Sequence, residues 1–409
     1  MLDFVVRNAR LPGAPERTTD IGFANGRIAA LEPQLVCDAP SHDAEGCLCC
    51  GGLIETHIHL DKSRIIDRCA PETERSANAV KRVAAAKQHF TAEDVNVRAK
   101  LTLENCIRHG ATRMRTHVEV DPGVGMRGFD GVATLIDEYR WAIDIELCVF
   151  PQEGLTNNPG TDELMVEGLK RGAKVIGAAP GYDADHAGQI RRVFALARQF
   201  DVDVDMHLDF GNTADDMDIH LVCALTEEYR LGGRVAVGHS TKLSTVAPDK
   251  QKELARRLGD VGVAVTVLPA TDLFLMGRDQ HFNVRRGVVD ANLFVEHGCN
   301  CSISTNNILN PFTPYGDCSL IRMANLHANI LQISHVERLR ACFDMLTVRS
   351  ARLLNHRDYG IAVGHPADVV VIDAQTPEQA VAEIAPTLAA FKRGRRTVSR
   401  PRAELHWPS

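Results

Sequence analysis

The feature that most constrains the fold is a repeated alternation of short, β-branched apolar runs with helical segments. Residues 91–110 and 186–200, for example, carry apolar residues at three- and four-residue spacing, and Thr91 and Gly110 are suited to begin and end the first helix. Eight strand-like runs separate such segments, at 49–59, 111–120, 143–150, 174–180, 201–209, 234–240, 263–270 and 300–305. Eight strands that alternate with helices predict an α/β fold, a parallel (β/α)8 barrel over residues 49–365.

The two ends of the chain show a different pattern. Residues 1–48 and 366–409 contain short strand-like runs joined by Gly and Asn turns, such as "DIGFANGRIAAL" and "ADVVVIDA". We therefore expect the two ends to form one small sheet domain together, outside the barrel.

Composition and charge narrow the range of partners. The formal net charge of −7 gives no basic excess that would attract phosphate backbones, which argues against nucleic acid and leaves small molecules as the expected partner. No apolar run approaches the ~18 residues of a membrane helix and the first apolar stretch contains charges, so we expect no membrane span, no secretory signal and a cytoplasmic protein. The 12 cysteines are then expected to be buried free thiols.

Histidines stand at the ends of four of the predicted strands. His57 and His59, in "ETHIHLDK", lie two residues apart, so their side chains point to the same face of the strand. His117, His207 and His239 end three further strands. Because the C-terminal ends of barrel strands meet at one mouth, we expect these imidazoles to converge there. Imidazole nitrogens bind zinc, iron and related divalent ions, which lower the pKa of water toward neutrality, so the pattern predicts metal-dependent hydrolysis.

Together, these motifs resemble the amidohydrolase superfamily and, within it, the cytosine deaminases and the N-isopropylammelide isopropylaminohydrolases. The likeness runs in order over essentially the whole chain, and it is carried by "GGLIETHIHLDK", "RTHVEVD", "FPQEGL", "MHLD", "GRVAVGHSTKLS", "NPFTPYGD" and "DYGIAVGHPADVVVID". The resemblance implies a (β/α)8 TIM-type barrel with a small β-sandwich formed by both termini. It also implies one divalent metal ion, zinc or iron, with manganese as a third option.

Carried over position by position, the resemblance implies a metal site and a substrate site. His57, His59 and His207 would bind the metal, and His239 would contact it or hold its water. Gln152, in "FPQEGL", would read the amide-like edge of a heterocyclic ring. The relatives are oligomers, so the resemblance also implies a homo-oligomer.

Two positions depart from the pattern of the family. Strand 8 of the family ends with an aspartate that binds the metal and accepts a proton, but Asn306 stands there, and a shift that brings in Asp317 would break the neighbouring "NPFTPYG" match. Phe210 stands where cytosine deaminases have a proton-carrying glutamate, and with Phe312, expected to cover the ring, it makes the pocket apolar on one side. An amide takes up no proton at neutral pH, so another group must be the catalytic base. The candidates are Asp209, Lys62 and His239.

Each of the first two candidates has an alternative role. Asp209 lies two residues after a predicted metal ligand and could instead orient that imidazole, and Lys62 could instead form a surface ion pair.

The sequence therefore predicts a metal-dependent amidohydrolase that breaks a carbon–nitrogen bond of a small-molecule nitrogen heterocycle, by deamination or dealkylamination. Two alternatives stay open. One is a ring-opening cyclic amidase. The other is a catalytically silent homologue that binds a heterocycle, because the expected aspartate and glutamate are replaced by Asn306 and Phe210.

Overall fold

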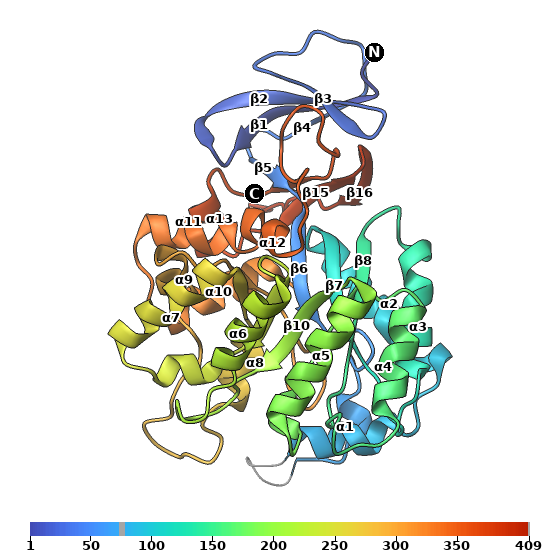
Figure 1. Cartoon of the computed structure of the whole chain (residues 1–409). Coiled ribbons are helices and arrows are strands. Elements are labelled where there is room, and N and C mark those ends of the chain that lie inside the picture. Colours follow the sequence, from blue (N-terminus) through green and yellow to red (C-terminus); the bar gives the residue numbers. More distant parts are fainter. Residues whose placement is uncertain (73–77, 408–409) are drawn as a thin grey trace.

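Eight parallel strands form a barrel in the computed structural model, which describes residues 1–72 and 78–407 (Figure 1). The strands pair in chain order, β6(Leu53–Ile58), β7(Ala111–Glu119), β8(Asp144–Phe150), β9(Val175–Ile176), β10(Asp203–Leu208), β11(Val235–His239), β12(Val263–Val267) and β13(Cys301–Ile303). A parallel bridge between Ile58 and Asn306 joins the last strand region to the first. The expected (β/α)8 barrel is confirmed.

Helices alternate with the strands and cover the outside of the barrel (Figure 1). In α2 the hydroxyl of Thr91 accepts a hydrogen bond from the backbone N–H of Asp94, and Gly110 follows with φ of +90°, so both expected helix ends are confirmed. The helices are α1(Ala79–Lys87), α2(Ala92–Arg108), α3(Arg127–Glu138), α4(Thr161–Lys170), α5(His186–Phe200), α6(Ile219–Tyr229), α7(Pro248–Val261), α8(Pro269–Leu275), α9(Ala291–Glu296), α10(Leu320–Ile330), α11(Val336–Asp344), α12(Val348–Leu353) and α13(Pro377–Ala382).

The first predicted strand, residues 49–59, is in fact two strands in two sheets. β5(Leu48–Gly51) belongs to the terminal sheet, and β6 begins the barrel after Gly52. A Cβ on Gly52 would lie 2.0 Å from the hydroxyl oxygen of Thr112, so only glycine allows the chain to pass from one sheet to the other here. Because residues 49–59 read as one continuous strand-like run, the sequence pattern did not reveal this break.

Both chain ends form the second sheet, as expected. Its strand order is β16-β15-β14-β5-β1-β2-β3, with β4 paired to β1. Phe23 of β2 and Phe391 of β15 lie 5.6 Å apart between ring centroids although three strands separate β2 from β15, so the sheet folds over itself as a small sandwich. The remaining bounds are β1(Phe4–Leu11), β2(Ala14–Ala24), β3(Arg27–Glu32), β4(Ser41–Asp43), β14(Val369–Ile372), β15(Thr387–Lys392) and β16(Arg395–Ser399). The exact domain boundaries, 48/49 and 365/366, stay predictions.

A buried lysine joins the two sheets. Lys392, 1% exposed at the end of β15, donates hydrogen bonds to the Thr112 carbonyl of β7, to the Asp144 carboxylate of β8 and to Asp368. Thr112 and Asp144 lie at the starts of their strands, so the terminal sheet is attached at the N-terminal end of the barrel. The opposite end is left open for an active site.

The state of the thiols agrees with the expectation from composition. All 12 cysteines are free, and each is buried except the partly buried Cys37. In the part of the chain that the structure describes, no helix combines the length and the apolar character needed to cross a membrane.

Candidate active site

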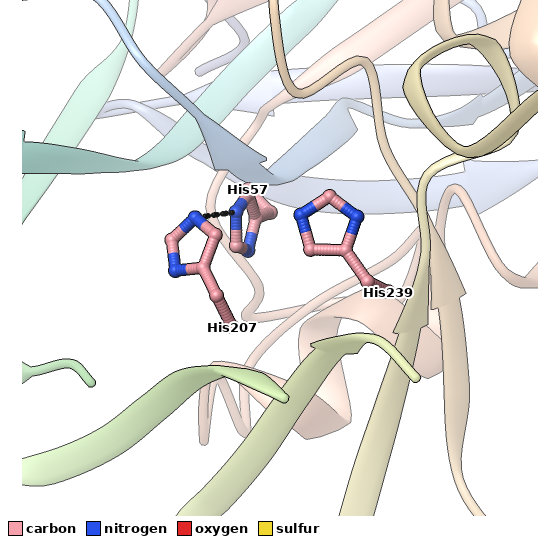
Figure 2. A group of neighbouring side chains, drawn as sticks. All are labelled: His57, His207 and His239. Carbon is pink, nitrogen blue, oxygen red and sulfur yellow. Dashed lines mark hydrogen bonds between the residues drawn. The ribbon is translucent and has the colours of Figure 1, made fainter. Parts of the chain in front are cut away.

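Four of the predicted histidines meet at the C-terminal ends of the barrel strands. The Nε2 atom of His207, on β10, lies 3.2 Å from Nε2 of His57 and 3.0 Å from Nε2 of His59, both from the end of β6. One ring nitrogen each of His57, His207 and His239 lies within 4.8 Å of the others. Figure 2 shows these three rings grouped together, with the contact between His57 and His207 as a dashed line.

The donor set fits a divalent metal ion. The three imidazoles of His57, His59 and His207 are buried or nearly so, and their Nδ1 atoms lack hydrogen-bond partners among the described residues. Burial, reinforced by His117, lowers the pKa of His57 to about 3, which keeps this ring in the neutral form that ligates metal. Neutral imidazole nitrogens gathered this closely around His207 are the donors that zinc and iron sites use.

Asp205, which the sequence did not single out, lies beside the imidazole rings of His57 and His117. The Oδ1 atom of Asp205 lies 3.6 Å from Nδ1 of His57 and 3.5 Å from Nε2 of His117, whose ring stacks on His57 at 3.8 Å. Arg115 fixes the other carboxylate oxygen at 2.9 Å. Its signal was present in "DVDVDMHLD", because Asp205 precedes His207 by two residues and so shares its strand face.

A second missed aspartate holds His239. Asp272 belongs to α8 and is fully buried. Its Oδ1 atom lies 2.5 Å from Nδ1 of His239, the last residue of β11. This contact leaves Nε2 as the ring nitrogen of His239 that is directed toward the site. Burial raises the pKa of Asp272 although His239 opposes the shift. An acidic residue one turn after β12 was the only sequence signal, and it is a weak one.

Asn306 follows β13, the eighth barrel strand, and pairs with the end of the first. Its backbone N–H donates to the carbonyl of His57 and its carbonyl accepts from the N–H of His59, both at 3.0 Å. Its side-chain nitrogen lies 3.4 Å from Nε2 of His239, and its amide oxygen has no hydrogen-bond partner within the described ranges. Asp317, the residue that a shifted match would bring in, pairs with Arg322 at 2.9 Å.

Both carboxylate oxygens of Asp209 are engaged by the helix that follows its strand. Its two carboxylate oxygens accept the backbone N–H groups of Asp218 and Ile219, at 2.8 and 3.0 Å, and so cap the start of α6. Burial raises the pKa of Asp209. The carboxylate borders the cavity but is engaged with the helix rather than with His207.

The expected substrate residues line a single cavity of about 300 Å³ over the histidines. Gln152 follows β8, and Phe312 belongs to the loop after β13; both are buried. Phe210, 40% exposed, stands at the mouth with its ring edge-on to His239 at 5.6 Å. The structure therefore brings together the polar edge and the apolar side that the sequence predicted.

Lys62 is buried in the wall rather than paired at the surface. Its Nζ atom lies 2.8 Å from Oε1 of Gln152 and 3.4 Å from Glu119, and the faces of Phe150 and Phe312 lie 5.1 and 5.0 Å away. Burial opposes the charged form of Glu119, but Lys87 and Lys62 lower the pKa of Glu119 to about 2. Lys62 therefore does not form the surface ion pair that was its alternative role, because the aromatic rings and Glu119 enclose the ammonium.

A parallel barrel with a polar, histidine-lined cavity at the C-terminal ends of its strands is the architecture of barrel enzymes that act at this mouth. The amidohydrolase family profile matches residues 129–399 of the chain. The chain belongs to the amidohydrolase family, and the expected class, hydrolases acting on carbon–nitrogen bonds, is confirmed.

Named relatives match most of the chain. N-isopropylammelide isopropyl amidohydrolase of Pseudomonas sp. (strain ADP) is 25% identical over 403 residues, 96% of each chain. Pterin deaminase of Rhizobium rhizogenes (strain K84) is 23% identical over 364 residues, 87% of this chain and 82% of the relative. The structure of 5-methylcytosine deaminase from Klebsiella pneumoniae with 5-fluorocytosine has a TM-score of 0.93 at 27% identity and covers 99% of each chain. All three names refer to nitrogen heterocycles.

Proposed function

We propose that this protein is a metal-dependent amidohydrolase that cleaves a carbon–nitrogen bond of a small nitrogen heterocycle. The observation that carries the proposal is the convergence of His57, His59 and His207 under the cavity that Gln152 lines. The names of the three relatives support the substrate class. A homo-oligomer in the cytoplasm stays a prediction.

His57, His59 and His207 would hold the ion, which is zinc or iron in this proposal, with manganese as a third option. When bound, such an ion acidifies water and polarises the carbon under attack. Gln152 orients the ring by hydrogen bonds, while Phe312 and Phe210 cover its apolar side and exclude water from it.

His239 with Asp272 is the proposed proton acceptor. The amide of Asn306 cannot take a proton, and both oxygens of Asp209 cap a helix, so neither is suited to the role. His239 takes the proton of the attacking water at Nε2, and Asp272 stabilises the resulting imidazolium through Nδ1–H. The proton is then available to the leaving nitrogen.

We propose release of ammonia or an alkylamine as the finer reaction. Phe210 stands edge-on to His239, where an apolar substituent on the leaving nitrogen would pack. A ring-opening amidase would use the same ligands but would give an acid and no free amine, so product analysis separates the two reactions.

The test combines metal analysis with a product screen. Protein purified without added metal should contain close to one divalent ion per chain by elemental analysis, and it should release ammonia or amine from at least one of a set of pyrimidines, triazines and pteridines. His207→Ala should lose both ion and turnover, whereas the exposed control His220→Ala should keep both. If the wild-type protein stays metal-free after incubation with divalent ions, or if it binds a full equivalent of metal but forms no product, the protein is a catalytically silent homologue.

A further inference from the structure

The cavity over the histidines contains a second histidine–carboxylate pair besides His239 and Asp272. The Nδ1 atom of His186, the first residue of α5, lies 2.9 Å from Oδ2 of Asp218, the residue before α6. Both side chains line the same cavity of about 300 Å³ as His239. The proton path through His239 leaves this pair unused, although it offers the same chemical groups.

The starts of two helices hold this pair in place. Asp185 caps α5 by accepting the backbone N–H of Gly188 at 2.8 Å, which fixes the turn that carries His186. The backbone N–H of Asp218 donates to Asp209, also at 2.8 Å. Because Asp218 engages Nδ1 of His186, Nε2 is the ring nitrogen left for a ligand, and it has no hydrogen-bond partner among the described residues.

The two histidine–carboxylate pairs lie on either side of His207. His186 follows β9 and His239 ends β11, while β10, which carries His207, lies between these two strands. The cavity is small enough that a heterocyclic ring over His207 reaches both walls. The side chain of His186 is 42% exposed, against 9% for that of His239, so His186 exchanges protons with solvent more easily.

Hydrolysis at a carbon–nitrogen double bond of a ring needs a second proton carrier. When the oxygen of water attacks the ring carbon, the electron pair of the double bond moves to the ring nitrogen, which must gain a proton. His239 accepts the proton that the water loses, so it cannot supply this one. We propose that protonated His186 donates a proton from Nε2 to the ring nitrogen while Asp218 holds its Nδ1–H. The inference rests on the proposed function and adds a catalytic residue to it.

The protons balance over one turnover. The bond from the water oxygen to the ring carbon forms as the ring nitrogen gains its proton from His186. His239 then gives its proton to the leaving nitrogen, the bond from the ring carbon to that nitrogen breaks, and ammonia or an alkylamine departs. The carbon–oxygen double bond forms as the hydroxyl proton passes to His186. His186 is then protonated again and His239 is neutral again, as at the start.

Two substitutions of His186 separate proton transfer from simple binding. His186→Ala and His186→Gln should each lower kcat about 100-fold, because glutamine donates a hydrogen bond but exchanges no proton. KM should stay within about threefold of wild type, and metal content should be unchanged. His220→Ala, an exposed histidine of α6, is the control and should keep the wild-type kcat. Near-wild-type kcat in His186→Gln, or a loss carried by KM alone, would overturn the inference.

Chemical rescue tests the proton transfer directly. Because His186 is partly exposed, free imidazole can enter the space that His186→Ala opens. Imidazole should raise the kcat of His186→Ala at least about tenfold, whereas acetamide, which forms hydrogen bonds but carries no proton near neutral pH, should not. Rescue by both compounds, or by neither, would contradict the role of His186.

Asp218 acts through His186, so its effect should depend on that residue. Asp218→Asn should lower kcat about tenfold in the wild-type background but no further in the His186→Ala background, because the two residues work as one unit. An equal loss in both backgrounds would show that Asp218 serves the fold and not the proton transfer.

The same samples separate this inference from the proposed function. A wild-type protein that releases no amine from any ring refutes the proposed function, and the inference falls with it. An active wild-type protein whose His186 variants keep their kcat refutes the inference alone. Loss of kcat in both variants, with imidazole rescue and full metal content, supports both.

Discussion

Asp272 is the residue whose role is easiest to isolate. Asp272→Asn keeps the shape but exchanges the carboxylate that holds Nδ1 of His239 for a neutral amide. Turnover should fall about 10- to 100-fold, while metal content is retained because His57, His59 and His207 are untouched. Steady-state kinetics and elemental analysis check this, with the exposed Asp249→Asn as control. Full activity in Asp272→Asn would remove the His239–Asp272 pair from the mechanism.

Asn306 is the position where the chain departs most from its family resemblance. Asn306→Asp would place a charge where the amide oxygen now has no hydrogen-bond partner among the described residues. We expect metal affinity to rise at least about tenfold, because a carboxylate binds a divalent ion more strongly than an amide oxygen does. Competition with a chelator of known affinity measures it. Unaltered affinity would mean that the side chain does not face the ion.

At the scale of single elements, Asp209 stabilises the start of α6. In Asp209→Asn only one oxygen remains to accept the two N–H groups of Asp218 and Ile219, so the free energy of unfolding should fall by about 1 kcal/mol. Turnover should stay within a few-fold of wild type. Urea unfolding and kinetics test this beside the exposed control Asp215→Asn. A hundredfold loss of turnover with metal retained would instead make Asp209 the base.

α10 contains a buried histidine that makes the fold acid-sensitive. Burial lowers the pKa of His327 to about 4, against about 6.5 in an unfolded chain. Between these values the unfolded state binds the extra proton, so the folded state loses stability as the pH falls. In His327→Leu the loss between pH 7 and pH 4.5 should be smaller by about 2 kcal/mol. Urea midpoints at the two pH values measure it, and parallel curves for both proteins would contradict the assignment.

At the scale of the whole molecule, Lys392 couples the terminal sheet to the barrel. Lys392→Met leaves Asp144 and Asp368 without their shared cation, so we expect the free energy of unfolding to fall by about 3 kcal/mol. The exposed Lys250→Met should change it little. Because the junction lies at the opposite end of the strands from the histidines, the KM of any residual folded enzyme should be unchanged. Calorimetry and kinetics on the same samples decide this.

The sequence by itself determined the pattern of elements and the histidine positions. Alternating apolar runs and helices, with His57, His59, His207 and His239 at strand ends, predict the barrel and the convergence, because period and strand-end position are local properties. The division of the first strand at Gly52 depends on a contact with a distant strand, which no local pattern reveals.

Only the tertiary structure decided what these side chains contact. Asp205 under His57, Asp272 behind His239, the α6 cap at Asp209 and the Lys62–Gln152 pair all join residues from different elements. Hydrogen bonds between elements depend on distances that are set by packing, whereas strand and helix periods depend on neighbours in the chain. The sequence therefore specified which residues reach the mouth of the barrel, and packing specified which of them hold, orient or cap one another.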